Sequence, residues 1–230
     1  MSYTALSNIE ERKAQYIEAI HYYLSNTNYS IVFVENSGTD MSDLFTHYIH
    51  SGRMEYLTFH GNQNKERGKG YGECEIIQYA LDHSDIIRSD CHKQITKITG
   101  RLIVKNIKAI IRLHTALFPK RTVFCSINSD LSFPDSRLII APTDFFHLFL
   151  RVKERINDQK GYYFEHALCD TLKKEKAYCY SPFFINPLIK GMSGSTGVQY
   201  TEERQTLSFI YRYAKYAYSL RRKFYALNRN

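Results

Sequence analysis

The sequence predicts an α/β fold, in which a mixed sheet is flanked by helices and followed by a basic amphipathic helix at the C-terminal end. Three observations favour it. Helical and strand patterns alternate up to about residue 140, short apolar runs end in loops rich in glycine and charge, and the last segment combines aromatic residues with cations. We expect one domain over residues 1–200 and a basic, aromatic helix within 201–230.

The composition is that of a globular protein with an anionic partner. The chain has 230 residues, of which 43% are hydrophobic and 23% charged, enough for one sizeable core. The formal net charge of +8 favours nucleic acid, a phosphorylated ligand or an anionic membrane as the partner.

Cysteine usage and hydropathy indicate the compartment. The 5 cysteines show no C-x-x-C spacing, so neither a disulfide framework nor a zinc site is indicated, and we expect reduced thiols. The first residues lack the basic and apolar regions of a secretory signal. No apolar run approaches the ~20 residues of a membrane span. We therefore expect a cytoplasmic protein, peripheral at the inner face of the cytoplasmic membrane.

The first half of the chain predicts alternating helices and strands. Apolar residues recur with helical spacing over 9–25, and Ser7 or Asn8 can cap this helix. The continuous run Ile31–Val34 is typical of a strand buried on both faces. The next expected elements are a helix over 42–50, a strand over 55–59, a polar loop over 60–72, a helix over 73–82 and a strand around 95–98.

The second half continues this pattern with less regular spacing. The expected elements are a basic helix over 105–117, strands over 122–127 and 138–140, helices over 143–155 and 162–172, strand-like runs within 181–190, a glycine-rich loop over 191–197 and a helix over 207–227. Pro182 and Pro187 interrupt the strand-like runs, because proline cannot donate to a sheet. We find no internal repeat and no linker that would separate further domains.

The stretch Glu35–Asp40 follows the first predicted strand and contains candidate ligand-binding groups. The Glu35 carboxylate could accept hydrogen bonds from a uracil N–H or from ribose hydroxyls. Ser37 and Gly38 would let the backbone approach the ligand. The alternative is a plain turn in which Thr39 or Asp40 caps the next helix.

The stretch Gly68–Glu73 precedes a predicted helix and has the chemistry of an anion site. Glycines permit close backbone approach, a helix N-terminus favours anions and Lys69 adds a positive charge, while Glu73 opens the helix. The spacing fits neither a P-loop nor G-x-G-x-x-G. The alternative is a flexible, solvated loop.

Lys97 and Arg101 form a candidate diphosphate clamp. On an extended segment they would lie on one face, because side chains alternate along a strand. Two cations on one face, one of them a guanidinium fork, could hold a diphosphate. The alternative is a solvated, basic strand edge.

Two segments of the second half offer a general base. Glu165 follows an aromatic stretch, and burial beside aromatic rings would raise its pKa. His166 is the alternative base, and Asp135 lies in a polar cluster between two predicted strands. A helix surface or a satisfied core pair would explain the same residues without catalysis. The histidines show no metal-ligand spacing, and Ser193 and Ser195 could bind an acceptor.

The C-terminal segment Tyr211–Tyr225 interleaves aromatic residues with Lys and Arg. Such a helix can lie on an anionic bilayer or on nucleic acid. A helix docked on the domain with a solvated basic face is the third possibility.

Taken in order, these motifs resemble bacterial glycosyltransferases of the GT-A fold, the nucleotide-diphospho-sugar transferase superfamily. The stretch 31–40 is similar to the family's second strand and its Asp-Asn-Gly-Ser-Thr-Asp turn, and 64–80 is similar to the loop and helix after its third strand. The resemblance covers about the first 105 residues. The chain further resembles small capsule or lipopolysaccharide transferases that share a Lys-Ile-Thr-Gly-Arg stretch and a late Ser-Gly-Ser-Thr-Gly loop.

The resemblance implies transfer of a sugar from a nucleotide-sugar, with a UDP-sugar expected, to a surface-polysaccharide or lipid-linked glycan acceptor. It places Glu35 at the nucleoside, Lys69 and Glu73 near the donor, and Glu165, with Asp135 in reserve, as the general base. Where the family has a metal-binding Asp-x-Asp, this chain has the stretch 97–101.

That departure implies a reaction in which no protein-bound metal is expected, with Lys97 and Arg101 neutralising the leaving diphosphate as fixed cations. Inverting and retaining transfer both stay open. The alternatives are a nucleotidyltransferase, whose chemistry usually needs carboxylates that hold Mg²⁺, and a non-catalytic basic module that binds nucleic acid. As a glycosyltransferase the chain is not expected to bind nucleic acid.

Overall fold

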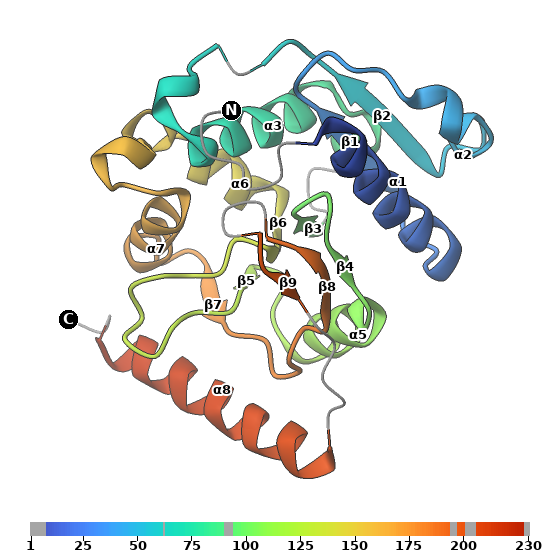
Figure 1. Ribbon diagram of the computed structural model, residues 1–230. Coiled ribbons are helices and arrows are strands. Elements are labelled where there is room, and N and C mark those ends of the chain that lie inside the picture. The colour runs from blue at the N-terminus through green and yellow to red at the C-terminus, as the bar shows by residue number, and fades with distance from the viewer. Residues whose placement is uncertain (1–7, 62, 90–93, 194–196, 201–205, 228–230) are drawn as a thin grey trace.

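The computed structural model describes residues 8–61, 63–89, 94–193, 197–200 and 206–227. These residues form an α/β protein (Figure 1). Its helices are α1 (Ile9–Asn26), α2 (Thr46–His50), α3 (Lys69–His83), α4 (Asp85–Arg88), α5 (Ile107–Leu117), α6 (Thr143–Leu150), α7 (Phe164–Lys174) and α8 (Leu207–Leu227). Its strands are β1 (Ile31–Glu35), β2 (Met54–Thr58), β3 (Gln94–Ile98), β4 (Ile103–Val104), β5 (Thr122–Phe124), β6 (Leu138–Pro142), β7 (Cys179–Ser181), β8 (Ile189–Met192) and β9 (Gln199–Tyr200).

The described strands form three sheets, although the sequence predicts one mixed sheet. β1 pairs with β2 in parallel, from Ile31 opposite Met54 to Glu35 opposite Thr58. The second sheet has the order β3-β6-β5-β7, in which only β5 and β7 are parallel neighbours. The third has the antiparallel order β4-β8-β9.

Helix α1 begins and ends as its sequence predicts. The Asn8 side chain accepts hydrogen bonds from the N–H groups of Glu10 and Glu11. The helix runs antiparallel to β1: the ring of Tyr16, two turns into the helix, lies 5.7 Å from the ring of Phe33 in the middle of the strand. At its other end, the Leu24 carbonyl accepts a bond from Arg53, whose own carbonyl accepts from the N–H of Ile31. The first turns of α1 therefore lie at the carboxyl end of β1.

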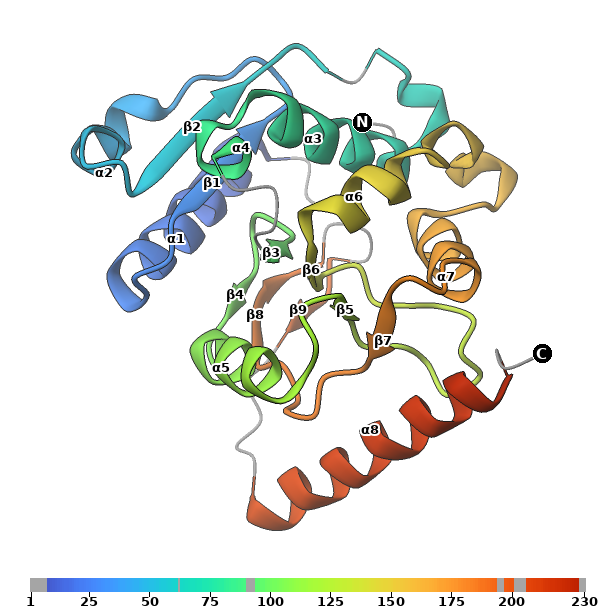
Figure 2. The same cartoon turned by 180° about the vertical axis from the view of Figure 1, so that it is seen from behind.

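Two hydrophobic layers cover the strands. On one face of the second sheet, Leu138 and Ile140 of β6 pack with α5. On the other face, Ile139 and Ala141 pack with residues of α3, α6 and α7. Because successive side chains of β6 point to opposite faces, this strand contributes to both hydrophobic layers, as expected for a sheet covered by helices on each side. Figure 2 shows α3 and α6 together on one side of the molecule.

Helix α8 has the bounds that the sequence predicts, and it docks on β7. Its buried side chains are Ala217, Leu220 and Phe224. The Phe224 ring lies 4.5 Å from the Tyr180 ring. The Tyr225 hydroxyl donates to the Tyr180 carbonyl at 3.0 Å and accepts from its N–H at 2.9 Å. None of the helices that the structure describes is both long enough and apolar enough to cross a bilayer.

Several element boundaries differ from prediction. α3 begins at Lys69 rather than Glu73. The helix expected over 143–155 ends at Leu150, where the chain tightens into turns. Between β7 and β8 the two prolines leave no strand, because they lack an N–H. Cys74, Cys125 and Cys169 are buried free thiols, as expected, and Cys179 is a half-buried free thiol.

Candidate functional site

A cavity of about 1590 Å³ lies at the carboxyl ends of β1 and β3. The start of α3, the first turns of α1 and the start of α7 complete its polar end. It brings together these predicted site residues: Glu35, Lys69, Glu73, Lys97, Arg101 and Glu165. Ser37 and Asp135 are not among its lining residues. Carboxyl ends of strands are where α/β proteins bind their ligands.

The turn after β1 is held by Glu35 itself. Its Oε2 atom accepts hydrogen bonds from the N–H groups of Ser37, at 2.7 Å, and Thr39, at 3.0 Å. Gly38 has a φ of 78°, and a Cβ there would lie 2.2 Å from the His60 ring. Ser37 is exposed and its hydroxyl pairs with that of Thr39. The turn thus has a structural role, while the Glu35 side chain also lines the cavity.

The N-terminus of α3 is not an open anion site, because a carboxylate of this chain already occupies it. The N–H of Gly70 donates to Asp158 Oδ2 at 3.1 Å. A Cβ at Gly68, whose φ is 95°, would lie 2.4 Å from the Asp158 side chain. The glycines that we expected to approach a ligand therefore let Asp158 approach the helix. Lys69 and Glu73 lie on the helix rather than in a loop before it.

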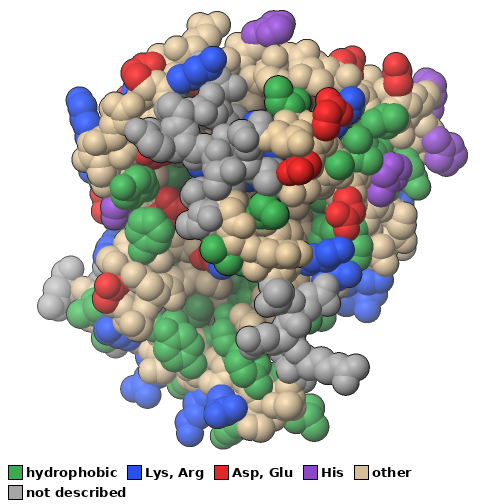
Figure 3. All heavy atoms as spheres, in the orientation of Figure 1, with side chains coloured by type: hydrophobic (Ala, Val, Ile, Leu, Met, Phe, Trp, Pro, Cys, Tyr) green, Lys and Arg blue, Asp and Glu red, His purple; other side chains and the backbone are tan. Residues whose placement is uncertain are grey.

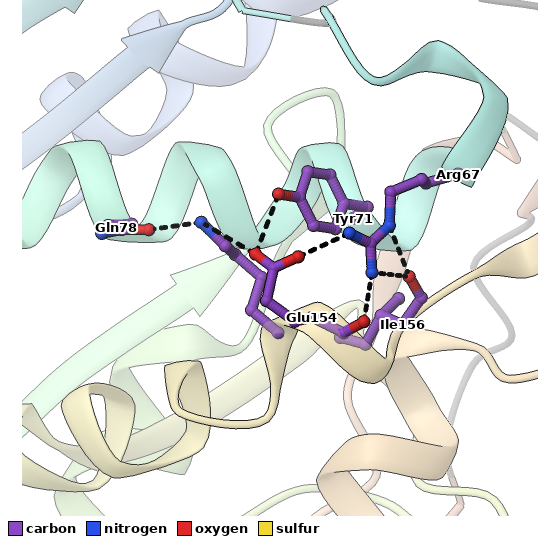
Figure 4. A network of polar contacts seen from close by, with 6 residues as sticks. Arg67, Tyr71, Gln78, Glu154 and Ile156 are labelled. Carbon is purple, nitrogen blue, oxygen red and sulfur yellow. Dashed lines mark hydrogen bonds and ion pairs between the residues drawn. The ribbon is translucent and has the colours of Figure 1, made fainter.

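A polar network fixes α3 against the chain around residues 153–156 (Figure 4). The Arg67 guanidinium forms a salt bridge with Glu154 at 2.5 Å and donates to the Ile156 carbonyl from Nε at 3.2 Å. Tyr71 donates to the same carboxylate at 3.1 Å, and the guanidinium lies 4.1 Å from its ring. Arg67 holds the pKa of Glu154 below its usual range. This network orients the turn of α3 that carries Lys69 and Glu73.

Lys69 and Arg101 form the cationic part of the cavity. Burial lowers the pKa of the Lys69 ammonium, and the Arg101 guanidinium lowers this pKa further. Asp158 opposes both effects, and Arg12 of α1 adds to the repulsion. The Nη1 atom of Arg101 is buried and has no hydrogen-bond partner in the described part of the chain. A buried cationic donor without a partner favours an anionic ligand.

The extended segment expected from Lys97 to Arg101 ends at Ile98. The Leu102 N–H donates to the Thr99 carbonyl at 2.8 Å, so a turn follows β3 and carries Arg101 out of the strand. The two cations are therefore not presented side by side on one strand face, as we expected, although both line the cavity. The sequence missed this because Gly100 fits a strand edge and a turn equally well.

Lys97 is engaged by α3 and by the segment before β6. Its ammonium forms a salt bridge with Glu73 and donates to the Ser136 carbonyl at 2.5 Å. The exposed fractions of these side chains are 11% for Lys97 and 26% for Glu73. The Lys97 charge is thus largely desolvated and is shared with a carboxylate of the protein.

Glu165 has the properties of a proton acceptor at the same cavity. Burial raises the pKa of its carboxyl group, and the neighbouring Glu73 carboxylate adds to this rise. A hydrogen bond from the Ser136 hydroxyl, 2.6 Å from Oε1, and the Lys97 charge oppose it. A carboxyl group with a raised pKa is suited to general-base catalysis near neutral pH.

The other proposed bases have structural partners. Asp135 forms a bidentate pair with Arg137, in which Nε lies 2.9 Å from Oδ1 and Nη2 lies 2.6 Å from Oδ2. The side chain of His166 accepts a bond from the Tyr163 N–H and thereby caps α7. Ser193 lines the cavity, whereas Ser195 lies outside the described residues.

Among the described residues, no group of three or more His, Cys, Asp and Glu side chains could hold a metal ion. Asp90, the acidic residue nearest to the expected metal motif, lies outside them. The site also contains residues that sequence reasoning missed: Arg12, Ser136 and Asp158. Each is brought to the site by tertiary packing, and no local motif marks them.

Comparisons with protein-family models, with curated proteins and with solved structures found no match to this chain.

Proposed function

We propose that this cavity is the active site of a GT-A-type glycosyltransferase, which moves a sugar from a UDP-sugar to a surface-polysaccharide or lipid-linked glycan. The observation that carries the proposal is the meeting of half-buried cations and a carboxyl group of raised pKa in one cavity. Inverting glycosyl transfer uses both: positive charge at the leaving diphosphate and a base at the acceptor hydroxyl.

On the donor side, Arg101 and Lys69 bind the diphosphate. A diphosphate between them would supply a partner for Arg101 Nη1 and relieve the repulsion that lowers the pKa of Lys69. Lys97 lies on the same wall, but Glu73 shares its charge. The Glu35 carboxylate, at the end of β1, binds the nucleoside.

On the acceptor side, Glu165 removes the proton from the attacking hydroxyl. The hydroxyl oxygen forms a bond to the anomeric carbon while the bond from that carbon to the diphosphate oxygen breaks. The nucleoside diphosphate leaves with the electron pair, and Glu165 keeps the proton until solvent takes it. The Ser136 hydroxyl orients the carboxylate for this step. Direct attack of this kind inverts the anomeric configuration.

The proposed location of the protein is the inner face of the cytoplasmic membrane, where α8 lies on the lipid surface. Arg212, Lys215 and Arg222 on this helix are exposed, and so are Leu207, at 87%, and Tyr211, at 68%. In Figure 3, cationic and hydrophobic side chains lie together on the lower part of the molecule, where Figure 1 shows α8. Aromatic and basic side chains on one helix are typical of interfacial helices.

A donor screen tests the proposal. Thermal unfolding and hydrolysis are measured with UDP-, GDP-, dTDP- and CMP-sugars, each with and without EDTA. We expect UDP to raise the unfolding temperature and a UDP-sugar to be hydrolysed slowly, in both conditions. If no nucleotide stabilises the protein and no nucleotide-sugar is consumed, the proposal is refuted. Activity that EDTA abolishes would refute the use of fixed cations in place of a metal.

A further inference from the structure

The same cavity continues between β1 and β3 as a slot. Among the described strands, β1 pairs only with β2 and β3 only with β6. The free edge of each strand faces the cavity, which is lined without interruption by residues 31–36 and 94–102. β3 is followed by Gly100, where a Cβ would lie 3.6 Å from the ring of Phe33, the central residue of β1. The chain that follows β3 therefore lies beside β1 across the slot.

Backbone groups that have no strand partner among the described residues point into the slot. The N–H of Ile31 donates to Arg53 and the Glu35 carbonyl accepts from Phe59, so the odd-numbered residues of β1 face β2. By alternation, Val32 and Val34 direct their N–H and C=O groups to the slot. On β3, the Thr99 N–H donates to Arg137, and the same alternation directs Thr96 and Ile98 to the slot. Backbone groups beside buried apolar walls favour a strand partner.

Both faces of the slot are covered by helices. Tyr16 and Ile20 of α1, with Ile107 and Ile111 of α5, line it on one side. The other side is lined by apolar residues of α3, α4 and α6: Ile76, Ile77, Ala80, Leu81, Ile86, Ile87 and Phe146. These are the layers that cover the sheets on either side, so the layers continue across the gap while the strands do not.

The apolar side chains of the bordering strands are less buried than their position predicts. Ile31, Val32, Val34, Ile95 and Ile98 are only half-buried, although helices cover both faces. Strands covered on both faces are normally buried along their length. One more strand would bury these side chains and pair the backbone at ~4.8 Å from each neighbour.

We propose that an extended apolar segment, attached to the chain ahead of α1, occupies the slot as a strand parallel to β1. The first turns of α1 lie at the carboxyl end of β1, so a strand that leads directly into α1 runs parallel to β1. Strand, α1 and β1 then form a right-handed crossover unit. The sheets join in the order β2, β1, new strand, β3, β6, β5, β7.

The residues that line the slot indicate which residue types the inserted segment contains. Both faces are apolar, so the segment is a run of about five Val, Ile or Leu residues. Residues 1–7, Met-Ser-Tyr-Thr-Ala-Leu-Ser, are not a run of this kind. The carboxyl end of the inserted segment reaches the polar part of the cavity between Glu35 and Lys97. The inference is independent of the proposed function, because its readouts are stability and amide exchange.

The test fuses Lys-Lys-Val-Ile-Val-Ile-Val ahead of Met1 in the full chain. The control carries Lys-Lys-Val-Pro-Val-Pro-Val, because proline cannot donate to a ladder. Gel filtration selects monomer of each. We expect the first extension to raise the unfolding temperature by at least about 5 °C over the control. Amide exchange at Val32, Val34 and Thr96 should slow at least about tenfold.

Equal stability and equal exchange for the two extensions would refute the strand. In a second experiment, the peptide of the first extension is added in excess, as a free molecule, to the chain without an extension. If it protected these amides while the fused segment did not, the slot would accept a strand but the attachment through α1 would be refuted.

Discussion

Lys97 of β3 and Glu73 of α3 form a salt bridge across the polar end of the cavity. The two residues come from separate motifs of the sequence, and the bridge joins the sheet to the helix layer. It fixes the Lys97 ammonium in place, and it places a carboxylate close enough to Glu165 to raise the pKa of that group. The stability of the site and its chemistry therefore share one ion pair.

Removing one partner of this pair should cost stability and turnover. Lys97→Met leaves the Glu73 carboxylate without its cation, and we expect a loss of about 1–3 kcal/mol in the free energy of unfolding. Urea unfolding measures this loss. Lys97→Met with Glu73→Gln should regain most of the stability but not the turnover. If the double variant regained turnover, Lys97 would have no role beyond balancing Glu73.

Arg101→Ala should weaken UDP binding by about 10–100-fold, because each charge-assisted hydrogen bond contributes about 1.5–3 kcal/mol. Lys69→Ala should act in the same direction. Isothermal titration with UDP and with uridine separates the causes, since only UDP carries the diphosphate. The matched control is Arg112→Ala, which removes an exposed cation of α5 outside the cavity lining. Equal losses for uridine and UDP would contradict a diphosphate role.

Glu165→Gln should lower turnover by at least about 100-fold while UDP binding is kept. In the wild type, turnover should rise with pH through the raised pKa of Glu165, because the base acts ionised. A pH–rate profile that does not change in shape between wild type and a Glu165→Asp variant would contradict this assignment.

The same substitution should stabilise the protein at neutral pH. The pKa of Glu165 is higher in the folded than in the unfolded chain, so between its usual value near 4.5 and the raised value the folded state binds more protons. Stability is therefore lost as the pH rises through that window, and Gln removes the loss. Thermal unfolding at pH 4 and pH 8 measures it. A lower unfolding temperature for Glu165→Gln at pH 8 would contradict the sign.

Because of the buried His114, we expect the free energy of unfolding to fall in mild acid. Burial lowers the pKa of its ring, whose Nδ1 donates to the Ile110 carbonyl at 2.7 Å while Nε2 accepts from the Phe184 N–H at 2.9 Å. The unfolded chain therefore takes up a proton first, and the free energy of unfolding should fall as the pH drops through 6.5. Urea unfolding at pH 7.5, 6.5 and 5.5 should show a weaker pH dependence for His114→Gln. The control His147→Gln, an exposed histidine of α6, should keep the wild-type dependence.

Membrane binding through α8 should depend on anionic lipid. We expect co-sedimentation with phosphatidylglycerol vesicles, weakened by salt, and none with phosphatidylcholine alone. Arg212→Glu with Lys215→Glu should reduce binding at least about tenfold. Lys108→Glu with Arg112→Glu makes the same charge change on α5 and should reduce it less. Equal reductions by both pairs would show that net charge, not α8, determines binding.

Sequence patterns predicted the elements that depend on local signals. Asn8 and two glutamates mark the start of α1, and a continuous amphipathic pattern gives α8 its bounds. The start of α3 was predicted wrongly, because Gly68 and Gly70 are typical of a loop. The helix forms there since Asp158, 88 residues further along the chain, caps it. Local propensity cannot report a cap supplied by tertiary packing.

For the candidate site too, the sequence predicted what depends on local signals and missed what depends on tertiary packing. Composition and order identified Lys69, Arg101 and Glu165, which line one cavity. The pairing of Lys97 with Glu73, and the turn that separates Arg101 from Lys97, depend on how α3 packs on β3. The sequence also carries no sign of the gap between β1 and β3, because each run by itself is typical of an ordinary buried strand.

Ser136 uses its backbone carbonyl for Lys97 and its hydroxyl for Glu165. A displacement of Lys97 by an arriving anion would therefore move the hydroxyl that holds the carboxylate on the opposite wall. Ser136 thus connects the hydrogen bonding of Lys97 to that of Glu165, so an anion that displaced Lys97 would also alter the hydrogen bond that opposes the rise in the Glu165 pKa.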